Sequence, residues 1–196
     1  MWYVARHKID VEKGVTMKRI ALFALGVFAM FGAAFAQTPD IDTPLLALAP
    51  NLRADAGVIK WKPDHTYDTL KPSKNGLVCY DRSGFPLQQP FSLECTDQRN
   101  LDRAKQNLEA EALGDKMKSE ARLAELEKSG MRVKPAFGSV WYHLMGPSKE
   151  MARSHMTIAV PGATQATMGL PENGRGGGVW IMNAGTTTAH LMTPGE

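Results

Sequence analysis

Short runs of apolar, β-branched and aromatic residues recur along most of this chain, and several alternate apolar with polar positions, which is typical of β-strands. Turn residues such as those at 71–76, Lys-Pro-Ser-Lys-Asn-Gly, separate the runs and favour antiparallel pairing. The runs predicted to be strands cover residues 57–61, 66–70, 77–81, 91–95, 139–144, 156–160, 178–182 and 186–192.

Helical spacing of apolar residues occurs in one region, from about Asn100 to Ser129. The stripe is interrupted near its middle, where Gly114 can end one helix and Asp115 can cap the next. We therefore expect two helices, or one long helix kinked at Gly114. The dense mixture of Glu, Lys and Arg in this region indicates a solvated outer face.

These patterns together predict an α+β fold. Its mostly antiparallel sheet is expected to come from the residues after Pro135 together with the segment around the two cysteines, with the helical pair or kinked helix beside it. Residues 37–54 are rich in Pro, Ala and Leu without a sustained period and are expected to form an extended N-terminal leader on a single domain, 55–196.

An export signal is predicted at Met17–Ala36. Lys18 and Arg19 precede an apolar run, and Ala34-Phe35-Ala36 places small residues where a signal peptidase cleaves. Residues 1–16 have neither a signal pattern nor a helical period, so we interpret residues 1–36 as a misassigned leader plus a cleaved signal peptide. The mature protein is then expected in the periplasm or outside the cell.

Charge is balanced once this leader is removed. Of the 23 basic and 20 acidic residues in the chain, five and two lie within residues 1–36, which leaves 18 of each. No cluster of Lys and Arg remains, so we expect no nucleic-acid partner. The glycine-rich loop 173–178 precedes a predicted strand rather than a helix, which argues against a phosphate-binding loop, and no cofactor is expected.

Two cysteines, Cys79 and Cys95, remain in the mature chain. An even number in an exported protein favours a structural disulfide, here between two strands joined by a turn. A redox-active pair is the alternative, but catalytic dithiols usually lie two residues apart at the start of a helix. No cysteine directly follows the signal, so we expect no lipid anchor and no permanent membrane anchor.

Methionine accompanies histidine at two predicted strands. His143 with Met145, and His190 with Met192, lie two residues apart and would each share one face of a strand. Imidazole and thioether together suit copper, so these four residues are a candidate Cu(I) site if their strands are neighbours. The alternative is that the methionines fill the core.

A histidine-based hydrolase is a further hypothesis, with His143, His155 or His190 as the base. Ser139 or Ser154 could serve only if the tertiary fold brings them close, because neighbouring residues on a strand point to opposite faces. Neither a Gly-x-Ser-x-Gly motif nor a His-Glu-x-x-His motif occurs. The deciding observation is whether two of these histidines converge with a serine or a carboxylate in a concave pocket.

Our leading expectation is a non-enzymatic protein that binds a small ligand or an envelope partner. A small-molecule site combines aromatic walls with a few placed polar groups. The candidate ligand-binding residues are Trp141, His143, Arg153, His155, Trp180, Asn183, Thr187 and His190. The alternative is that the threonines are solvated on an edge strand and the tryptophans are buried in the core.

Four stretches, residues 76–81, 138–142, 157–163 and 180–188, resemble a group of uncharacterised exported bacterial proteins. The resemblance covers most of the mature chain. It implies export and a single compact domain, and it implies no particular activity.

Overall fold

The computed structural model describes residues 39–193. The predicted signal peptide, Met17–Ala36, and the preceding residues 1–16, which we interpret as a misassigned leader, lie outside the described residues. Within residues 39–193, no helix combines the length and the apolar character that crossing a bilayer would require.

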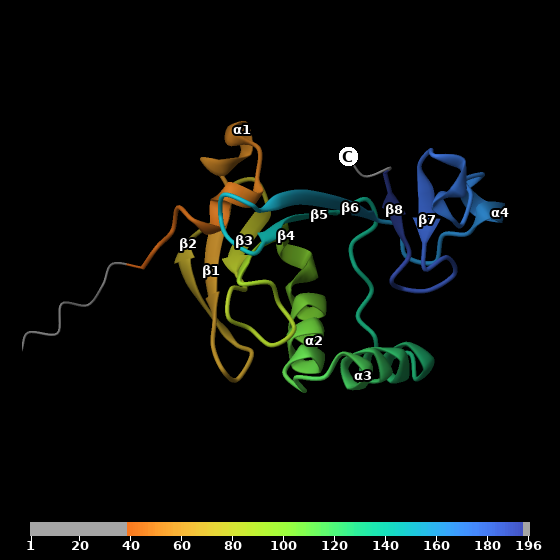
Figure 1. Ribbon diagram of the computed structural model, residues 1–196, viewed down its shortest axis with the longest axis horizontal. Helices are drawn as coiled ribbons and strands as arrows, with labels where there is room; N and C mark the ends of the chain where they lie inside the picture. The colour runs from red at the N-terminus through yellow and green to blue at the C-terminus, as the bar shows by residue number, and fades with distance from the viewer. Residues whose placement is uncertain (1–38, 194–196) are drawn as a thin grey trace, which may run out of the picture. The chain divides into compact units, whose positions relative to one another are not determined.

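Eight strands of the described residues form one sheet in the order β2-β1-β3-β4-β5-β6-β8-β7 (Figure 1). All neighbouring strands are antiparallel except β1 and β3, which are parallel. The strands are β1 (Gly57–Trp61), β2 (Tyr67–Lys71), β3 (Leu77–Asp81), β4 (Phe91–Asp97), β5 (Val140–Gly146), β6 (Arg153–Ala159), β7 (Trp180–Met182) and β8 (His190–Met192).

The helical region is a pair of helices, α2 (Leu101–Glu111) and α3 (Lys116–Lys128), which pack against each other. Gly114 lies between them with a φ of +68°, a conformation that glycine adopts without strain. The Asp115 side chain then accepts a hydrogen bond from the Lys118 N–H and caps α3. The α+β class, the mostly antiparallel sheet and the break between two helices are confirmed.

Five short helical turns complete the described secondary structure. They are η1 (Pro44–Ala47), α1 (Pro50–Arg53), η2 (Gln98–Asn100), α4 (Gln165–Met168) and η3 (Gly174–Gly176). The segment 39–54 contains two of these turns, η1 and α1, and its Leu45 and Leu48 are buried in the core.

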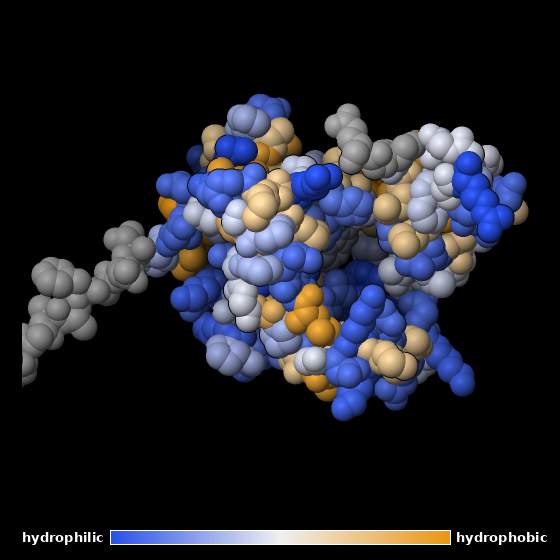
Figure 2. All heavy atoms as spheres, in the orientation of Figure 1, coloured by the Kyte–Doolittle hydropathy of each residue, from blue (hydrophilic) through white to orange (hydrophobic). Residues whose placement is uncertain are grey.

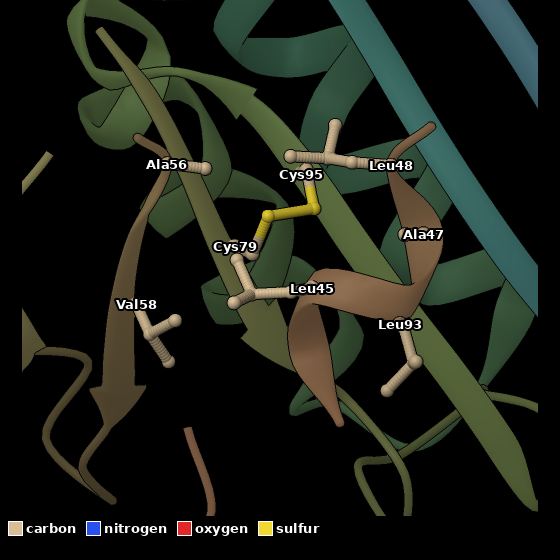
Figure 3. Packing of buried hydrophobic residues seen from close by; sticks show 8 residues of the cluster. All are labelled: Leu45, Ala47, Leu48, Ala56, Val58, Cys79, Leu93 and Cys95. Atoms are coloured by element: carbon tan, nitrogen blue, oxygen red, sulfur yellow. A yellow bond between two sulfur atoms is a disulfide. The ribbon is translucent and has the colours of Figure 1, made fainter. Parts of the chain in front are cut away.

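The disulfide anchors the core on one face of the sheet. Cys79 and Cys95 lie directly opposite each other on β3 and β4 and are bonded, as predicted. Leu45 of η1 and Leu48, the residue that follows η1, pack over them beside Leu93 of β4 (Figure 3).

The opposite face of the sheet packs against α2. Leu101, Ala104 and Leu108 of the helix are buried against a cluster that includes Tyr80 and Trp141. These residues sit at helical spacing on α2, as the apolar stripe predicted. This packing holds α2 against residues of β1, β3 and β5, and α2 so forms one wall of the site described below.

Two expectations about the sheet were wrong in detail. Strands β1 and β2 belong to the same sheet, so it does not consist only of the cysteine segment and the residues after Pro135. The run predicted at 186–192 is a strand only from His190. Its first residues form turns in which Thr186 N–H donates to Asn183 O and Ala189 N–H donates to Thr186 O.

Candidate functional site

A cavity of about 300 Å³ lies between the sheet and the helical pair. Figure 2 shows a hollow with hydrophilic side chains around it, at the place where Figure 1 has the segment that joins α3 to β5. The cavity is lined by Arg82, Glu94, Arg103, Asn107, Glu111, Leu123, Arg132, Pro135, Trp141, His143, Thr157, Ala159, Thr188, Ala189 and His190.

Buried charge is concentrated at one end of the cavity. Arg82 directly follows β3 and donates one Nη–H to Glu94 and another to Glu111, and the Tyr80 hydroxyl also donates to Glu94. Glu111 accepts a further hydrogen bond from Gln88 Nε2 at 2.9 Å. One guanidinium is therefore matched by two carboxylates, which together hold the end of β3, the middle of β4 and the end of α2.

The pKa values at this end follow from burial and pairing. Burial alone would raise the pKa of the Glu94 carboxyl, but Arg82, His143 and the hydrogen bond from Tyr80 outweigh it, so the pKa lies below its ordinary value. Burial and the charge of Glu94 raise the pKa of the Tyr80 hydroxyl well above its ordinary value. Glu94 is consequently ionised and Tyr80 is neutral at neutral pH.

His143 lies beside this cluster. It pairs with Glu94 across β4 and β5, with its Nδ1 3.5 Å from Glu94 Oε2. Burial lowers the pKa of His143, against the opposing effect of Glu94, so the imidazole is neutral at neutral pH. On its other side, His155 of β6 is exposed, with its ring centroid 6.0 Å from that of His143.

Two further arginines, Arg103 of α2 and Arg132 beyond α3, lie in the wall of the cavity, 4 % and 6 % exposed. Arg103 donates to the Val133 carbonyl and to the hydroxyls of Thr187 and Thr188. All three acceptors are neutral. The solvated outer face predicted for this helical region is therefore wrong at Arg103, because the side chain turns inward.

Arg132 makes similar contacts with the helix. Its guanidinium donates to the side-chain oxygens of Gln106 and Asn107, both neutral. Burial and, after it, the like charge of Arg132 lower the pKa of the Arg103 guanidinium to about 10, against the opposing effect of Glu127. Both arginines are still cationic at neutral pH.

Glu127 of α3 is the carboxylate that partly compensates these two cations. It accepts hydrogen bonds from the backbone N–H and the hydroxyl of Thr187. Burial raises the pKa of Glu127, but the Thr187 hydrogen bonds and then the charges of Arg103 and Arg132 outweigh burial and lower it. Glu127 therefore fixes the 186–189 turn against α3 while it stays ionised.

His190 contributes a second imidazole to the opposite wall. Its Nδ1 lies 2.7 Å from the Thr188 carbonyl oxygen, which can only accept, so Nδ1 carries a proton and donates it. The cavity thus combines cationic donors, carboxylates, two imidazoles and the indole of Trp141.

Among the residues predicted from the sequence to bind a ligand, three line this cavity: Trp141, His143 and His190. Thr187 is adjacent, through its contacts with Arg103 and Glu127. The other four do not line it: Arg153, His155, Trp180 and Asn183. The first two and Asn183 are exposed, and Trp180 packs close to Gly174.

The four residues of the copper hypothesis do not lie on neighbouring strands, because β6 separates β5 from β8. His143 pairs with His155, whereas His190 pairs with Ala159 four residues further along β6. The condition on which the four-residue copper site depended, neighbouring strands, is therefore not met. Within residues 39–193, no group of three or more His, Cys, Asp or Glu side chains could hold a metal ion.

Sequence reasoning missed the charged residues of the cavity, above all Arg82, Glu94, Arg103 and Arg132. The sequence did contain a signal for two of them, Arg103 and Glu94. Arg103 and Glu111 stand eight residues apart on one face of a helix, with Asn107 midway. Glu94 stands between Leu93 and Cys95 in a strand that is buried on both faces. An acidic residue in such a strand needs a buried partner.

The geometry of the cavity carries the functional argument, since comparison with protein-family models, with curated proteins and with solved structures found no match to this chain.

Proposed function

We propose that this protein binds a small ligand in the cavity between the sheet and α2. The observation that carries the proposal is the set of three buried arginines, two carboxylates and two histidines around about 300 Å³ of space. Burying charge is unfavourable unless it is paired or used, and ligand sites are where such groups converge.

The size and lining of the cavity support a small molecule rather than a protein partner. Its volume lies at the lower end of the range of about 300–1,000 Å³ that is usual for ligand pockets. Trp141, Leu123 and Pro135 supply apolar wall, and the charged groups supply orientation.

A fragment screen by ligand-observed NMR tests the proposal. Anionic, neutral and cationic fragments are screened against the wild type and against Thr157→Phe, which places an aromatic ring in the cavity at a strand position. Met156→Phe is the matched control, because Met156 is the preceding residue, points to the other face of β6 and is 43 % exposed. The proposal expects hits that Thr157→Phe abolishes and Met156→Phe retains. It fails if no fragment binds, or if every hit survives Thr157→Phe.

A second candidate function, hydrolysis with a histidine base, is favoured by one specific observation. His143 and His190 both line the cavity together with Glu94, and Glu94 lies 3.5 Å from His143 Nδ1, as a carboxylate that orients a base would. The hydroxyls in the lining belong to Thr157 and Thr188, and no serine of residues 39–193 contributes to it. The attacking group would therefore be a water. Turnover of p-nitrophenyl esters that is lost in His143→Gln would support this function, and equal rates in the two proteins would exclude it.

We also propose that the protein is exported to the periplasm or beyond. The Cys79–Cys95 disulfide supports this location, because such bonds persist in oxidising compartments. N-terminal sequencing of periplasmic material should begin at Gln37. An intact Met1 or Met17 terminus in that fraction would contradict it.

A further inference from the structure

Resting on the proposed binding function, we propose that the ligand carries an oxyanion, a carboxylate or a phosphate group, which Arg103 and Arg132 bind together. The proposal follows from three observations. They are the unused donors of these two arginines, the uneven distribution of charge around the cavity, and a free hydroxyl beside Arg103.

The unused donors come from counting hydrogen bonds. An arginine has five N–H groups and never ionises to a neutral form at physiological pH. Among the described residues, Arg103 makes three hydrogen bonds and Arg132 makes two, which leaves two and three N–H groups unused. Within residues 39–193, the side-chain nitrogens that are fully buried and have no hydrogen-bond partner are Trp61 Nε1 and Arg82 Nε. The Nε atoms of Arg103 and Arg132 are not among them, so each keeps some exposed surface and an N–H that no described residue uses.

Charge is unevenly matched along the cavity. Arg82 is hydrogen-bonded to two carboxylates, Glu94 and Glu111. Arg103 and Arg132 are both attracted by a single carboxylate, that of Glu127. Among the described residues, Glu127 forms its hydrogen bonds with Thr187 and with neither arginine. One end of the cavity thus has an excess of negative charge and the other an excess of positive charge.

Helix α2 sets the direction of this polarity. Arg103, Asn107 and Glu111 follow one another at intervals of four residues and all line the cavity. At 1.5 Å per residue, Arg103 and Glu111 are about 12 Å apart along the helix axis. An anion is repelled at the Glu111 end and attracted at the Arg103 end, where Asn107 keeps Arg132 beside the same helix face.

Thr188 adds a neutral donor at the positive end. Its Oγ1 accepts a hydrogen bond from Arg103 Nη2 at 2.8 Å, and within residues 39–193 its own hydroxyl hydrogen has no acceptor. A guanidinium pair with an adjacent hydroxyl is the donor set that suits a carboxylate or phosphate, whose oxygens accept charge-assisted hydrogen bonds.

Arginine-side-chain NMR tests this directly on the purified protein. The Nε–H signals of all arginines are followed in ¹⁵N spectra while sodium phosphate, sodium acetate or sodium chloride is added at constant ionic strength. Phosphate or acetate, at millimolar concentration, is expected to shift the Arg103 and Arg132 signals to saturation, whereas chloride leaves them in place. Saturation by phosphate alone identifies a phosphate-type ligand, and saturation by acetate alone a carboxylate.

Substitution of the two arginines is the second test of the inference. Arg103→Gln and Arg132→Gln should each weaken binding at least tenfold. Arg122→Gln is the matched control, because Arg122 lies on the exposed surface of α3, paired with Glu125 at 2.9 Å. If either glutamine variant fails to fold, the wild-type titration still decides. The inference is overturned if neither anion shifts the two signals beyond chloride, or if affinity is unchanged in the glutamine variants. Neutral or cationic fragments that bind the cavity while anions do not would overturn the inference and leave the proposed binding function standing.

Discussion

Glu94 and His143 face each other across β4 and β5, with Glu94 Oε2 3.5 Å from His143 Nδ1. The carboxylate is already engaged by Arg82 and Tyr80, so the histidine is a third neighbour of a charge that is nearly completely buried. The pKa of Glu94 and the pKa of His143 both lie below their ordinary values. Protonation of Glu94 and His143 at low pH should therefore destabilise the folded protein.

The first prediction is a loss of stability as the pH falls. A group whose pKa is lower in the folded protein binds protons more readily when unfolded, so its contribution is present above its unfolded pKa and is lost as the pH falls through its folded pKa. For His143 the loss begins near its ordinary pKa of 6.5, and for Glu94 near its ordinary pKa of 4.5. Urea unfolding at pH 7.5, 5.5 and 4 should give a decreasing free energy of unfolding. His143→Gln should flatten the step between pH 7.5 and 5.5, and an unchanged step would contradict the assignment.

The second prediction concerns the buried ion pair itself. Glu94→Gln removes the charge that faces Arg82 and His143, and breaking one side of a buried pair costs about 3–5 kcal/mol. The free energy of unfolding in urea should fall by that amount. Glu109→Gln on the exposed side of α2, where Glu109 is 3.9 Å from Lys105, should change it by less than about 0.5 kcal/mol. Equal effects of the two substitutions would show that the Glu94 pair adds nothing.

The third prediction is that the disulfide is structural. Cys79 and Cys95 are separated by 16 residues, and closing a loop of that size contributes about 3 kcal/mol in the chain-entropy model. Cys79→Ala with Cys95→Ala should lower the free energy of unfolding by about 2–5 kcal/mol. Peptide mapping without reduction should find the linked pair in the wild type, and alkylation of both thiols before reduction would refute it.

The fourth prediction concerns the N-terminal cap of α3. Asp115 caps α3, and Asp115→Ala should cost about 1 kcal/mol. Ser119 is the buried residue of this helix among those described, so we expect the loss to appear as local opening. Amide hydrogen exchange should speed up in α3 but not in β4. Uniform acceleration over both would mean that α3 opens only with the whole domain.

Strand positions were predictable from the sequence where turn residues bracket an apolar run. Strands β1 and β3 begin and end at the predicted residues. For β3, Gly76 and the Pro and Asn shortly before it leave the chain few alternatives. Gly114 and Asp115 were equally informative for the helices. The run 186–192 failed because its β-branched threonines suggested a strand, while Asn183 and Gly185, with φ of +56° and +79°, turn the chain there.

The site was less predictable because its groups meet only in the tertiary fold. Trp141 and His143 stood out as aromatic and titratable residues on one strand face, and both line the cavity. Arg103 and Arg132 did not stand out, because in a helical region rich in Glu, Lys and Arg the sequence does not show which cations turn inward. Which arginines are buried depends on the path of the chain from α3 to β5.

Crystals soaked in an anomalous scatterer test the central claim, an oxyanion-binding cavity beneath α2, most directly. Selenate stands in for a phosphate group and 4-bromobenzoate for a carboxylate ligand, each in separate crystals. The account predicts an anomalous peak within hydrogen-bonding reach of Arg103 and Arg132 in at least one of them. Peaks only outside the cavity, with no anomalous density beside these two arginines in either crystal, would contradict it.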